Sequence, residues 1–531
     1  MVKKMEKQLS APDSLRSPGA RAYRPYSHLE STGAEKRVVF EVENNWTWIT
    51  VADPFLLHVF DQEARYETPV ATAKEAGFIT PDEMPGAWDG WIRMLRRSKT
   101  MPPKIPTGLL PMLMRIAEKF GYDPEVLDKR VRPEEGFPEL KPVPLRDYQQ
   151  SAVEAGEREG RGVFDLPPRS GKTRAMMELQ RRIALPTIWI APTDRIVRQT
   201  QGVLEDWYGK NYSMHLIGTK EIEAAMKMQV VICTAATAAM LPEEFFQTRG
   251  MIVVDEWHHG AAKTYREIFK KCDHIYYRFG MTGTFFRSGG DGMAMHALLS
   301  NTIFKVSSRE LLARGYLVPT SVLFLPVLAP KLRGVPNTFQ TGHGKFGIQE
   351  HRERNLLVTQ VVTLLQKSGR KVLVLVGTKK QGRTLAAMIN GFVKPTPDSA
   401  EFKSVEFVST DTPRPIQTRI IDSFTDTDEV KVLIGTSLVG EGVDLPTTDA
   451  LVYARGEKAE VTLAQNAYRV CTAIEGKRDA IIVDFADRHH KKLLSHSMER
   501  MAVYHRDPVF DVEVLPTTQS FVDWMASKSL D

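Results

Sequence analysis

The chain has 531 residues, a formal net charge of +6 and a sequence pI of about 8.9, so any surface for a polyanion must be local. Its three cysteines, Cys233, Cys272 and Cys471, are widely spaced without a C-x-x-C pair, which argues against a disulfide framework and a zinc site. We expect a cytoplasmic protein without a membrane segment, because no apolar run approaches the roughly 18 residues of a transmembrane helix and residues 1–20 lack the apolar core of a signal peptide.

The amino-terminal part divides into three segments. Residues 1–35 mix Lys, Arg, Ser, Pro and Gly with little periodicity, which predicts a flexible tail. Residues 36–125 are expected to form a small α+β domain, and the Pro- and charge-rich stretch 126–144 an extended linker. The small domain carries a basic run interleaved with tryptophans: Trp88, Trp91, Arg93, Arg96, Arg97, Lys99 and Lys104. The run suits phosphate contacts with base stacking; alternatively, the tryptophans are core and the arginines a solvated face.

Residues 145–318 alternate apolar strands with helical stretches, as in the βαβ units of a parallel sheet. The strand Gly162 to Leu166 is followed by Ser170, Gly171, Lys172 and Thr173 and then by a helical segment, whose N-terminus suits a polyphosphate. Lys172 would reach the β/γ-phosphates of ATP, and the Thr173 hydroxyl would bind Mg²⁺. Leu166 replaces the usual first glycine of G-x-x-x-x-G-K-[ST], and Pro167, Pro168 and Arg169 fill the loop, so an ordinary turn is the alternative.

A second apolar strand, Met251 to Val254, ends in Asp255 and Glu256. In this place P-loop NTPases have an acidic partner for Mg²⁺, so Asp255 would hold the ion through water and Glu256 would orient or deprotonate the attacking water. The alternative is a charged strand end. His258 and His259 are adjacent on a loop without a nearby cysteine, which favours a structural role over a zinc site.

The same alternation continues over 319–500, with buried strands expected at 372–376, 432–434 and 481–483. The segment 328–347 interrupts this order, and we expect a mobile loop there, with DNA contact as the lesser alternative. Residues 501–531 are expected to form a C-terminal extension with a closing strand or helix. The fold class is therefore α/β, and two facing lobes would bind ATP at the carboxyl ends of their strands.

The series of motifs from Leu145 to Asp484 resembles that of the superfamily 2 helicases and translocases. The matching stretches are PLRDYQQSAV at 144–153, IAPTDRIVRQ at 190–199, VICTAATA at 231–238, RFGMTGTFFR at 278–287, KVLVLVGTKKQG at 371–382, IGTSLVGEGVDLP at 434–446 and QNAYRV at 465–470. The resemblance implies two tandem RecA-like lobes, 145–318 and 319–500, after a small accessory domain. Departures are Gly283 for Ala and Phe285 for Pro in motif III, and Tyr468 for Gly and Thr472 for a second Arg in motif VI.

The resemblance also implies roles for individual residues. Nucleotide contacts fall to Arg146, Gln149, Ser170, Gly171, Lys172, Thr173, Gly442 and Asp444, with Gln149 reading the adenine, and catalysis to Lys172, Asp255, Glu256, Gln465 and Arg469. The nucleic-acid track comprises Pro192, Thr193, Arg195, Thr234, Thr378 and Thr436, to which the accessory domain adds Arg93, Arg96 and Arg97. Arg469 is expected on a helix, with Thr472 three residues on, so that both face the same side and point into the cleft between the lobes. Since Thr472 carries no charge, Arg469 is expected to supply the arginine finger, with Arg455 or Lys477 next.

The amino-terminal part narrows the resemblance to the phage UvsW-type branch-migration helicases. The matching residues are Trp88, Asp89, Gly90, Gly108, Leu109 and Leu110, together with HRERNLL at 351–357. This resemblance implies an ATP- and Mg²⁺-dependent monomeric helicase that moves 3′ to 5′ on branched or forked DNA, in phage recombination and replication restart. The alternatives are a duplex translocase that does not unwind, and an RNA helicase, although no RNP aromatic pair is present.

Overall fold

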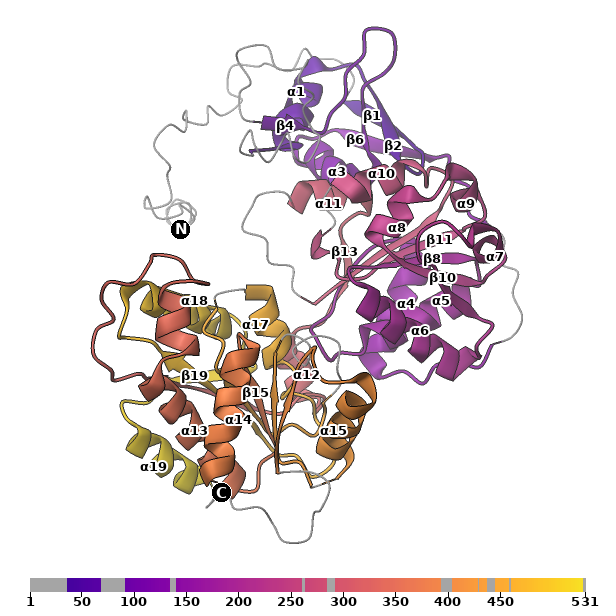
Figure 1. Ribbon diagram of the computed structural model, residues 1–531. Helices are drawn as coiled ribbons and strands as arrows, with labels where there is room; N and C mark the ends of the chain where they lie inside the picture. Colours follow the sequence, from indigo (N-terminus) through magenta and orange to yellow (C-terminus); the bar gives the residue numbers. More distant parts are fainter. Residues whose placement is uncertain are drawn as a thin grey trace.

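The computed structural model describes residues 36–67, 91–133, 140–259, 263–283, 292–392, 404–427, 429–436, 445–457 and 460–528. Figure 1 shows a small amino-terminal unit above a first α/β lobe, with a second α/β lobe beyond it. Each lobe is built on its own parallel sheet, so the predicted fold class of two RecA-like lobes preceded by a small α+β domain is confirmed.

The accessory domain is a mixed sheet covered by two helices. Its elements are β1 (Arg37–Val42), β2 (Trp46–Val51), α1 (Pro54–Glu63), β3 (Arg65–Glu67), β4 (Trp91–Arg93), β5 (Lys104–Pro106), the 3₁₀-helix η4 (Thr107–Leu109), α3 (Leu110–Lys119) and β6 (Asp123–Asp128). The sheet order is β5-β2-β1-β6, and only the β1–β6 pair in it is parallel. Alternation in β1 turns Val38, Phe40 and Val42 into the core. β6 extends into the stretch expected to be linker.

The accessory domain is joined to lobe 1 by a shared core and by buried polar contacts. A Cβ added at Gly108 would lie 1.9 Å from the His296 carbonyl oxygen of α11 (Gly292–Leu298), so the backbones meet there closely. The Arg161 guanidinium donates to the Asn44 carbonyl at 2.8 Å, and Arg278 donates to the Asn45 side chain at 2.6 Å. Accessory domain and lobe 1 therefore form one packed unit.

Lobe 1 is a parallel sheet in the order β13-β7-β12-β11-β8-β10-β9. Its strands are β7 (Arg161–Asp165), β8 (Thr187–Ala191), β9 (Ser213–His215), β10 (Val230–Thr234), β11 (Met251–Val254), β12 (Tyr277–Thr282) and β13 (Thr302–Lys305). Its other elements are α4 (Asp147–Glu159), α5 (Lys172–Ile183), α6 (Asp194–Tyr208), α7 (Ile222–Met226), α8 (Ala235–Met240), α9 (Glu243–Gln247), the 3₁₀-helix η5 (Trp257–His259), α10 (Lys263–Lys270), α11 and α12 (Ser308–Ala313). The central strands are continuously apolar because helices cover both faces.

Lobe 2 repeats this plan in the order β16-β17-β15-β18-β19-β14-β20. Its strands are β14 (Thr320–Pro326), β15 (Val372–Leu375), β16 (Val405–Val408), β17 (Val432–Gly435), β18 (Ala450–Tyr453), β19 (Ala480–Ala486) and β20 (Phe510–Val514). Its helices are the π-helix η6 (Lys345–Gln349), α13 (Arg352–Lys367), α14 (Lys379–Phe392), α15 (Arg414–Asp426), α17 (Glu460–Ala467), α18 (Lys491–His505) and α19 (Thr518–Lys528). The C-terminal residues thus supply an edge strand, β20, parallel to β14.

The segment 328–347 is packed on lobe 2, where the sequence had predicted a mobile loop. The backbone N–H of Leu332 donates to the His489 carbonyl at 2.9 Å, and the His343 ring stacks on His490 with centroids 5.1 Å apart. His489 Nε2 hydrogen-bonds the Gly347 carbonyl at 2.8 Å. The prediction failed because these partners lie far ahead in the chain, beyond the reach of local sequence patterns.

Candidate nucleotide and nucleic-acid site

Sheet order sorts the predicted site of lobe 1 into two halves. The phosphate loop follows β7, motif III follows β12 and the Asp255–Glu256 pair follows β11, and these three strands are neighbours. The stretches 190–199 (motif Ia) and 231–238 (motif Ib) span the carboxyl ends of β8 and β10, the next two strands. Because carboxyl ends of parallel strands meet at one edge, the nucleotide residues and the track residues lie side by side.

Two side chains of α4 hold the phosphate loop in place. The carbonyl oxygen of Ser170 accepts hydrogen bonds from the Tyr148 hydroxyl at 2.5 Å and from the Gln149 side-chain amide at 2.7 Å. The Gln149 side-chain oxygen accepts from the backbone N–H of Arg146 at 2.9 Å, which caps the helix. Gln149 is buried, so the structure places its amide against the phosphate loop.

The loop has room and polar groups for a polyphosphate. A Cβ added at Gly171, where φ is +74°, would lie 2.4 Å from the Gln149 amide nitrogen, so a side chain there would fill the cradle. The Ser170 hydroxyl is buried without a hydrogen-bond partner in the described part of the chain. Lys172, which begins α5, makes a long contact of 3.5 Å from Nζ to the Leu166 carbonyl, and Thr173 follows it in the first turn of the helix. Those residues fit a nucleotide phosphate.

The acidic pair lies close to this lysine. Asp255 is buried, and its carboxylate accepts from the backbone N–H of Glu256 at 2.9 Å. Burial, and then the neighbouring charge of Glu256, raise the pKa of Asp255 to about 6, while the charge of Lys172 opposes the rise. Glu256 has φ +48°, which bends the chain away from the strand. Two crowded carboxylates of this kind fit a hydrated divalent cation, which would relieve their repulsion.

The aromatic and histidine residues after the pair position it. Trp257 is fully buried, and its ring lies where a Cβ at Gly280 would come within 2.7 Å. His258 Nδ1 lies 3.3 Å from the Glu256 carboxylate. Among the described residues no group of His, Cys, Asp and Glu could hold a metal ion by protein ligands alone. His258 is therefore placed beside the Glu256 carboxylate, and its structural role stays a prediction.

Motif III contacts the lysine of the phosphate loop. A Cβ at Gly283 would lie 2.7 Å from Lys172 Nζ and 3.1 Å from Pro168 Cδ. The backbone N–H of Leu166 donates to the Thr282 carbonyl at 2.9 Å. Gly283, which stands where the family usually has alanine, has no Cβ and so leaves room for the Lys172 ammonium. Thr284 and Phe285 lie outside the described residues.

The track residues of lobe 1 occupy two helix starts. Thr193 caps α6, its hydroxyl accepting from the Ile196 N–H at 3.4 Å, and it is exposed, with Pro192 and Arg195 half-buried beside it. Thr234 caps α8 by accepting from the Thr237 N–H at 3.3 Å. Helix N-termini with hydroxyls are suitable for phosphate contacts.

In lobe 2 the track residues again follow neighbouring strands. Thr378 comes after β15 and Thr436 directly after β17, and both are half-buried. The Thr378 hydroxyl accepts from the Gln381 N–H at 3.2 Å. Gly442 and Asp444, the predicted nucleotide contacts of motif V, lie outside the described residues.

Motif VI departs from the predicted geometry. The sequence predicted that Arg469 lies on a helix and shares a face with Thr472, but α17 ends at Ala467. Arg469 lies in a turn, where its backbone N–H donates to the Asn466 carbonyl at 3.2 Å, and it is 6% exposed. Thr472 forms an antiparallel bridge with Leu317 in the segment between the lobes. The prediction was wrong because this long-range pairing, absent from any local pattern, ends the helix. Gln465, on α17, is half-buried.

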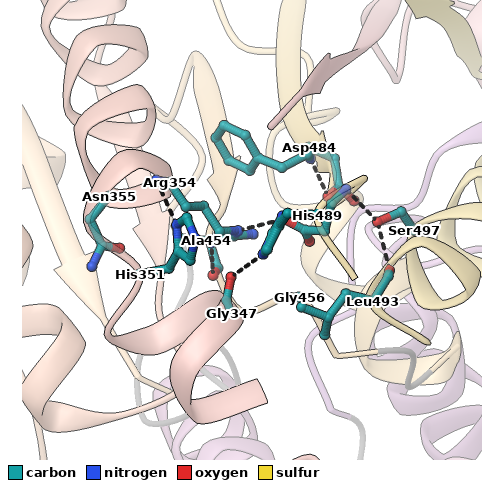
Figure 2. A network of polar contacts seen from close by, with 12 residues as sticks. Gly347, His351, Arg354, Asn355, Ala454, Gly456, Asp484, His489, Leu493 and Ser497 are labelled. Atoms are coloured by element: carbon teal, nitrogen blue, oxygen red, sulfur yellow. Dashed lines mark hydrogen bonds and ion pairs between the residues drawn. The ribbon is translucent and has the colours of Figure 1, made fainter. Parts of the chain in front are cut away.

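A buried polar network supports the loop that leads into motif VI, as Figure 2 shows. Arg354 donates to the Asp487 carboxylate and to the Ala454 carbonyl, each at 2.8 Å. Arg500 donates to both oxygens of Asp484, at 2.9 and 2.8 Å, and to the Gly456 carbonyl at 2.9 Å. These arginines and carboxylates are fully buried. Removing one partner would leave an uncompensated buried charge, so loss of any of these residues would strongly destabilise lobe 2 around the loop 454–457. The matching stretch HRERNLL contained Arg354, but nothing in it indicated the partners.

The basic run of the accessory domain is divided by the structure. Arg93 is 3.7 Å from the Asp61 carboxylate, whereas Arg96 and Arg97 are exposed and Arg97 donates to the Leu57 carbonyl at 3.2 Å. Arg96 and Lys104 pair across a hairpin, and Lys104 Nζ lies over the Trp46 and Trp48 rings. Trp88, Asp89 and Gly90 lie outside the described residues. The hairpin therefore presents Arg96, Arg97 and Lys99 together.

Sequence reasoning missed the residues that connect the two lobes. Tyr316 packs edge-on against Tyr148, with ring centroids 5.4 Å apart, and the Arg146 guanidinium lies over its ring. The Tyr316 carbonyl accepts from the Ala473 N–H at 3.4 Å. The sequence indicates neither contact, since Tyr316 belongs to no recognised motif.

Within the described ranges no helix is both long and apolar enough to cross a bilayer.

Comparison with known proteins gives matches over both lobes. Residues 142–287 match the family "Type III restriction enzyme, res subunit", and residues 354–473 match "Helicase conserved C-terminal domain". The ATP-dependent DNA helicase UvsW of Enterobacteria phage T4 is 22% identical over 470 residues, covering 79% of this chain and 88% of the relative. A putative DNA 3′-5′ helicase, Rad25 of Haloarcula marismortui, is 27% identical over 65% of this chain, which spans about half (52%) of that relative.

The fold also matches solved structures. An ATP-dependent type ISP restriction-modification enzyme, LlaBIII bound to DNA, aligns with a TM-score of 0.52 at 14% identity, covering 78% of this chain and 36% of that one. At this identity the likeness concerns the fold. The two family matches follow each other in the order in which the two parallel sheets occur, and the alignment with the phage relative covers 79% of this chain. The chain therefore belongs to the superfamily 2 helicases, with a UvsW-like relationship.

Proposed function

We propose that this protein is an ATP-dependent DNA helicase or translocase that remodels branched or forked DNA. The observation that carries the proposal is the clustering of Lys172, Asp255 and the phosphate loop at one edge of lobe 1, beside the track residues Thr193 and Thr234. The phage relative, which this chain covers to 88% of its length, is named an ATP-dependent DNA helicase. The Haloarcula relative is named a putative DNA 3′-5′ helicase, which supports movement of this protein in the 3′ to 5′ direction.

Each residue of the nucleotide site has one task in hydrolysis. Lys172 neutralises the β/γ-phosphates, and the Thr173 hydroxyl with Asp255 would hold Mg²⁺. Bound there, the ion would supply positive charge that neutralises the phosphates. Glu256 orients the attacking water and accepts its proton, and His258, 3.3 Å away, holds that carboxylate. Gln149 connects the adenine side of the site to the phosphate loop through Ser170.

Lobe closure completes the site. Arg469 belongs to lobe 2, and it stabilises the charge that develops on the γ-phosphate when the lobes approach. Thr193 and Thr234 grip the nucleic-acid backbone from lobe 1, and Thr378 and Thr436 grip it from lobe 2. Because both grips lie on the sheet edges that also carry the nucleotide residues, ATP binding and release alternate the two grips. The strand then advances stepwise.

The accessory domain supplies the preference for branched substrates. Its hairpin presents Arg96, Arg97 and Lys99 as exposed cations, and the domain is packed on lobe 1 through Gly108. Cations held rigidly beside the motor can contact a duplex arm by its phosphates while the lobes move on one strand. We infer a role in phage recombination and replication restart from this substrate class and from the phage relatives.

The test is ATP hydrolysis compared across single strands, duplexes, four-way junctions and RNA, together with strand displacement on a fork. The proposal expects the strongest stimulation by DNA junctions and ATP-dependent displacement. Duplex-stimulated hydrolysis without displacement would indicate a translocase that does not unwind. Stimulation by RNA above that by DNA would indicate an RNA helicase. Either result would overturn the proposed remodelling of branched or forked DNA.

A further inference from the structure

The phosphate loop contains a cation in a backbone conformation that disfavours its residue type. Arg169 has φ +67°, in the left-handed region that glycine adopts without steric cost. Residues with a Cβ that persist in this region are concentrated at functional sites, where the surrounding structure keeps them in place. A glycine would suit this position better for folding, so the arginine side chain is the property to explain.

The surroundings of Arg169 determine its backbone conformation. The Ser170 carbonyl, next along the chain, is clamped by Tyr148 and Gln149 at 2.5 and 2.7 Å. The Ser170 N–H donates to the Pro167 carbonyl at 3.2 Å. These bonds close a tight turn with Arg169 inside it. The guanidinium therefore starts from a rigid base at the entrance of α5, where phosphate is expected.

A chain of contacts connects this turn to the end of motif VI. Tyr148, which holds Ser170, packs on Tyr316, and the Tyr316 carbonyl accepts from the Ala473 N–H. Thr472, the preceding residue, is bridged to Leu317. Burial is the main cause that lowers the pKa of the Lys477 ammonium to about 8, and the positive charge of Arg169 lowers it further. The contacts through Tyr148 and Tyr316 thus place the turn that contains Arg169 near residues 472–473.

Motif VI of this chain lacks one positive charge at that place. Thr472 stands where the family has a second arginine, and its hydroxyl is buried without a hydrogen-bond partner among the described residues. The other candidate cations are committed elsewhere. Lys477 Nζ donates to the Pro446 and Thr448 carbonyls at 3.3 and 2.5 Å, and Arg455 pairs with Glu457 at 2.9 Å. Lys477 is largely buried, so leaving its two carbonyl partners would be costly. Arg455 is held by Glu457 through Nη2, while its Nε and Nη1 have no hydrogen-bond partner among the described residues.

We propose that Arg169 supplies, from the phosphate loop of lobe 1, the second transition-state charge that motif VI lacks at Thr472. This assignment rests on the proposed ATPase function. During hydrolysis the bond between the γ-phosphorus and the β–γ bridging oxygen breaks, water adds to phosphorus, and its proton leaves to Glu256. Negative charge grows on the bridging and γ-oxygens, where Arg169 and Arg469 act from opposite sides.

The placement on lobe 1 has a kinetic signature. An arginine of motif VI reaches the phosphates only in the closed state, whereas Arg169 is beside them in every state. Loss of Arg169 should therefore reduce basal and DNA-stimulated hydrolysis by similar factors. Loss of Arg469 should mainly remove the DNA-stimulated part.

The test is single-turnover ATP hydrolysis by Arg169→Gly with and without saturating single-stranded DNA. We expect both rates to fall about 10²-fold, the scale for one preorganised charge, while the Kd of a fluorescent ATP analogue changes less than about threefold. The melting temperature should not fall, because glycine suits φ +67°. Arg169→Lys should retain an intermediate rate. The matched control is Arg174→Ala, which removes an exposed arginine of α5 and should leave the rate unchanged.

Rescue gives a second readout. In the Arg169→Gly background, Thr472→Arg should raise the hydrolysis rate at least about tenfold, because it returns a positive charge to the position where the family has its second arginine. A wild-type rate in Arg169→Gly, or a loss of ATP affinity equal to the loss of rate, would overturn the assignment of Arg169. Hydrolysis that persists in Lys172→Ala would instead overturn the proposed ATPase site itself, so the two failures are distinguishable.

Discussion

The Tyr468 hydroxyl donates a hydrogen bond to the Asp507 carboxylate, which also accepts one from the Ser308 hydroxyl. Tyr468 lies in motif VI, Ser308 begins α12 before lobe 2, and Asp507 follows α18. Burial, and then the charge of Asp507, raise the pKa of Tyr468, so the phenol stays a donor. The tyrosine that replaces the usual glycine therefore ties motif VI to the C-terminal strand and to the connection between the lobes.

Tyr468→Phe should lower the free energy of unfolding by about 1.5–3 kcal/mol, because the half-buried Asp507 carboxylate loses one charge-assisted hydrogen bond. Urea denaturation of the full chain measures this. The control is Tyr453→Phe, since the buried Tyr453 hydroxyl has no hydrogen-bond partner among the described residues, and its removal should cost almost nothing. Equal losses in the two variants would show that the Asp507 contact is not a stabilising one.

Glu256→Gln should separate ATP binding from hydrolysis. The amide keeps the shape of the side chain but cannot accept the proton of water, so turnover should fall at least about 10²-fold with ATP still bound. Lys172→Ala is the companion variant, which should lose turnover while DNA binding stays near normal. Steady-state hydrolysis and nucleotide binding are the measurements. A fall of less than threefold for Glu256→Gln would show that another residue is the base.

Arg469→Ala should remove DNA-stimulated hydrolysis almost completely while ATP affinity changes little, since the loss falls on the transition state. Single-turnover hydrolysis with saturating DNA measures the effect. Arg455→Ala is a suitable comparison, because the structure engages Arg455 with Glu457. If Arg469→Ala stays within fivefold of wild type, the finger comes from another residue.

Glu178→Gln should weaken the attachment of the linker to lobe 1. The Glu178 carboxylate accepts from Arg181, Arg182 and the Val143 N–H, at 2.7 to 3.0 Å. Burial acts to raise its pKa, but these hydrogen bonds act more strongly and lower it from 4.5 to about 2. A lowered carboxyl pKa contributes stability above the unfolded value that is lost as pH falls toward the folded one.

The wild-type protein should therefore lose about 3 kcal/mol of stability through Glu178 between pH 4.5 and pH 2. Glu178→Gln should lack this part of the pH dependence and be less stable at pH 7. Glu154→Gln is the control, because Glu154 is exposed on α4. Chemical denaturation at several pH values gives the comparison, and parallel curves for wild type and Glu178→Gln would contradict the prediction.

Arg96→Ser with Arg97→Ser should weaken junction binding and make the salt dependence of log K shallower by about one unit for each lost phosphate contact. Single-strand-stimulated ATPase should persist. These point changes are preferable to deletion of residues 1–125, which would strip the face of lobe 1 that packs on Gly108. Arg158→Ser, at an exposed position of α4, is the control. An unchanged salt slope would show that the hairpin does not contact DNA phosphates and has a structural role instead.

The parallel sheets and the edges that carry the motifs were predictable from the sequence. Their central strands are short continuous apolar runs, as in Met251 to Val254, and each motif follows such a run directly. Catalytic groups at carboxyl ends of strands follow from that pattern and from known sheet geometry. The roles of the individual site residues remain predictions that rest on this placement.

Contacts over long sequence distances were not predictable. The end of α17 carries no glycine or proline, and the helix stops because Thr472 pairs with Leu317. The β20 strand is short and mostly exposed, so it lacks an apolar run and gave only a vague expectation. The buried pairs of Arg354 and Arg500 depend on Asp487 and Asp484, whose partners no local rule identifies.

Pairing of β20 with β14 determines the order in which lobe 2 can be completed during synthesis. The ribosome releases β14 long before Phe510 to Val514, so a nascent chain carries an unpaired strand edge for most of the translation of lobe 2. Such an edge attracts other strands. A protein truncated before Phe510 would keep every motif of the motor, and it would be expected to aggregate.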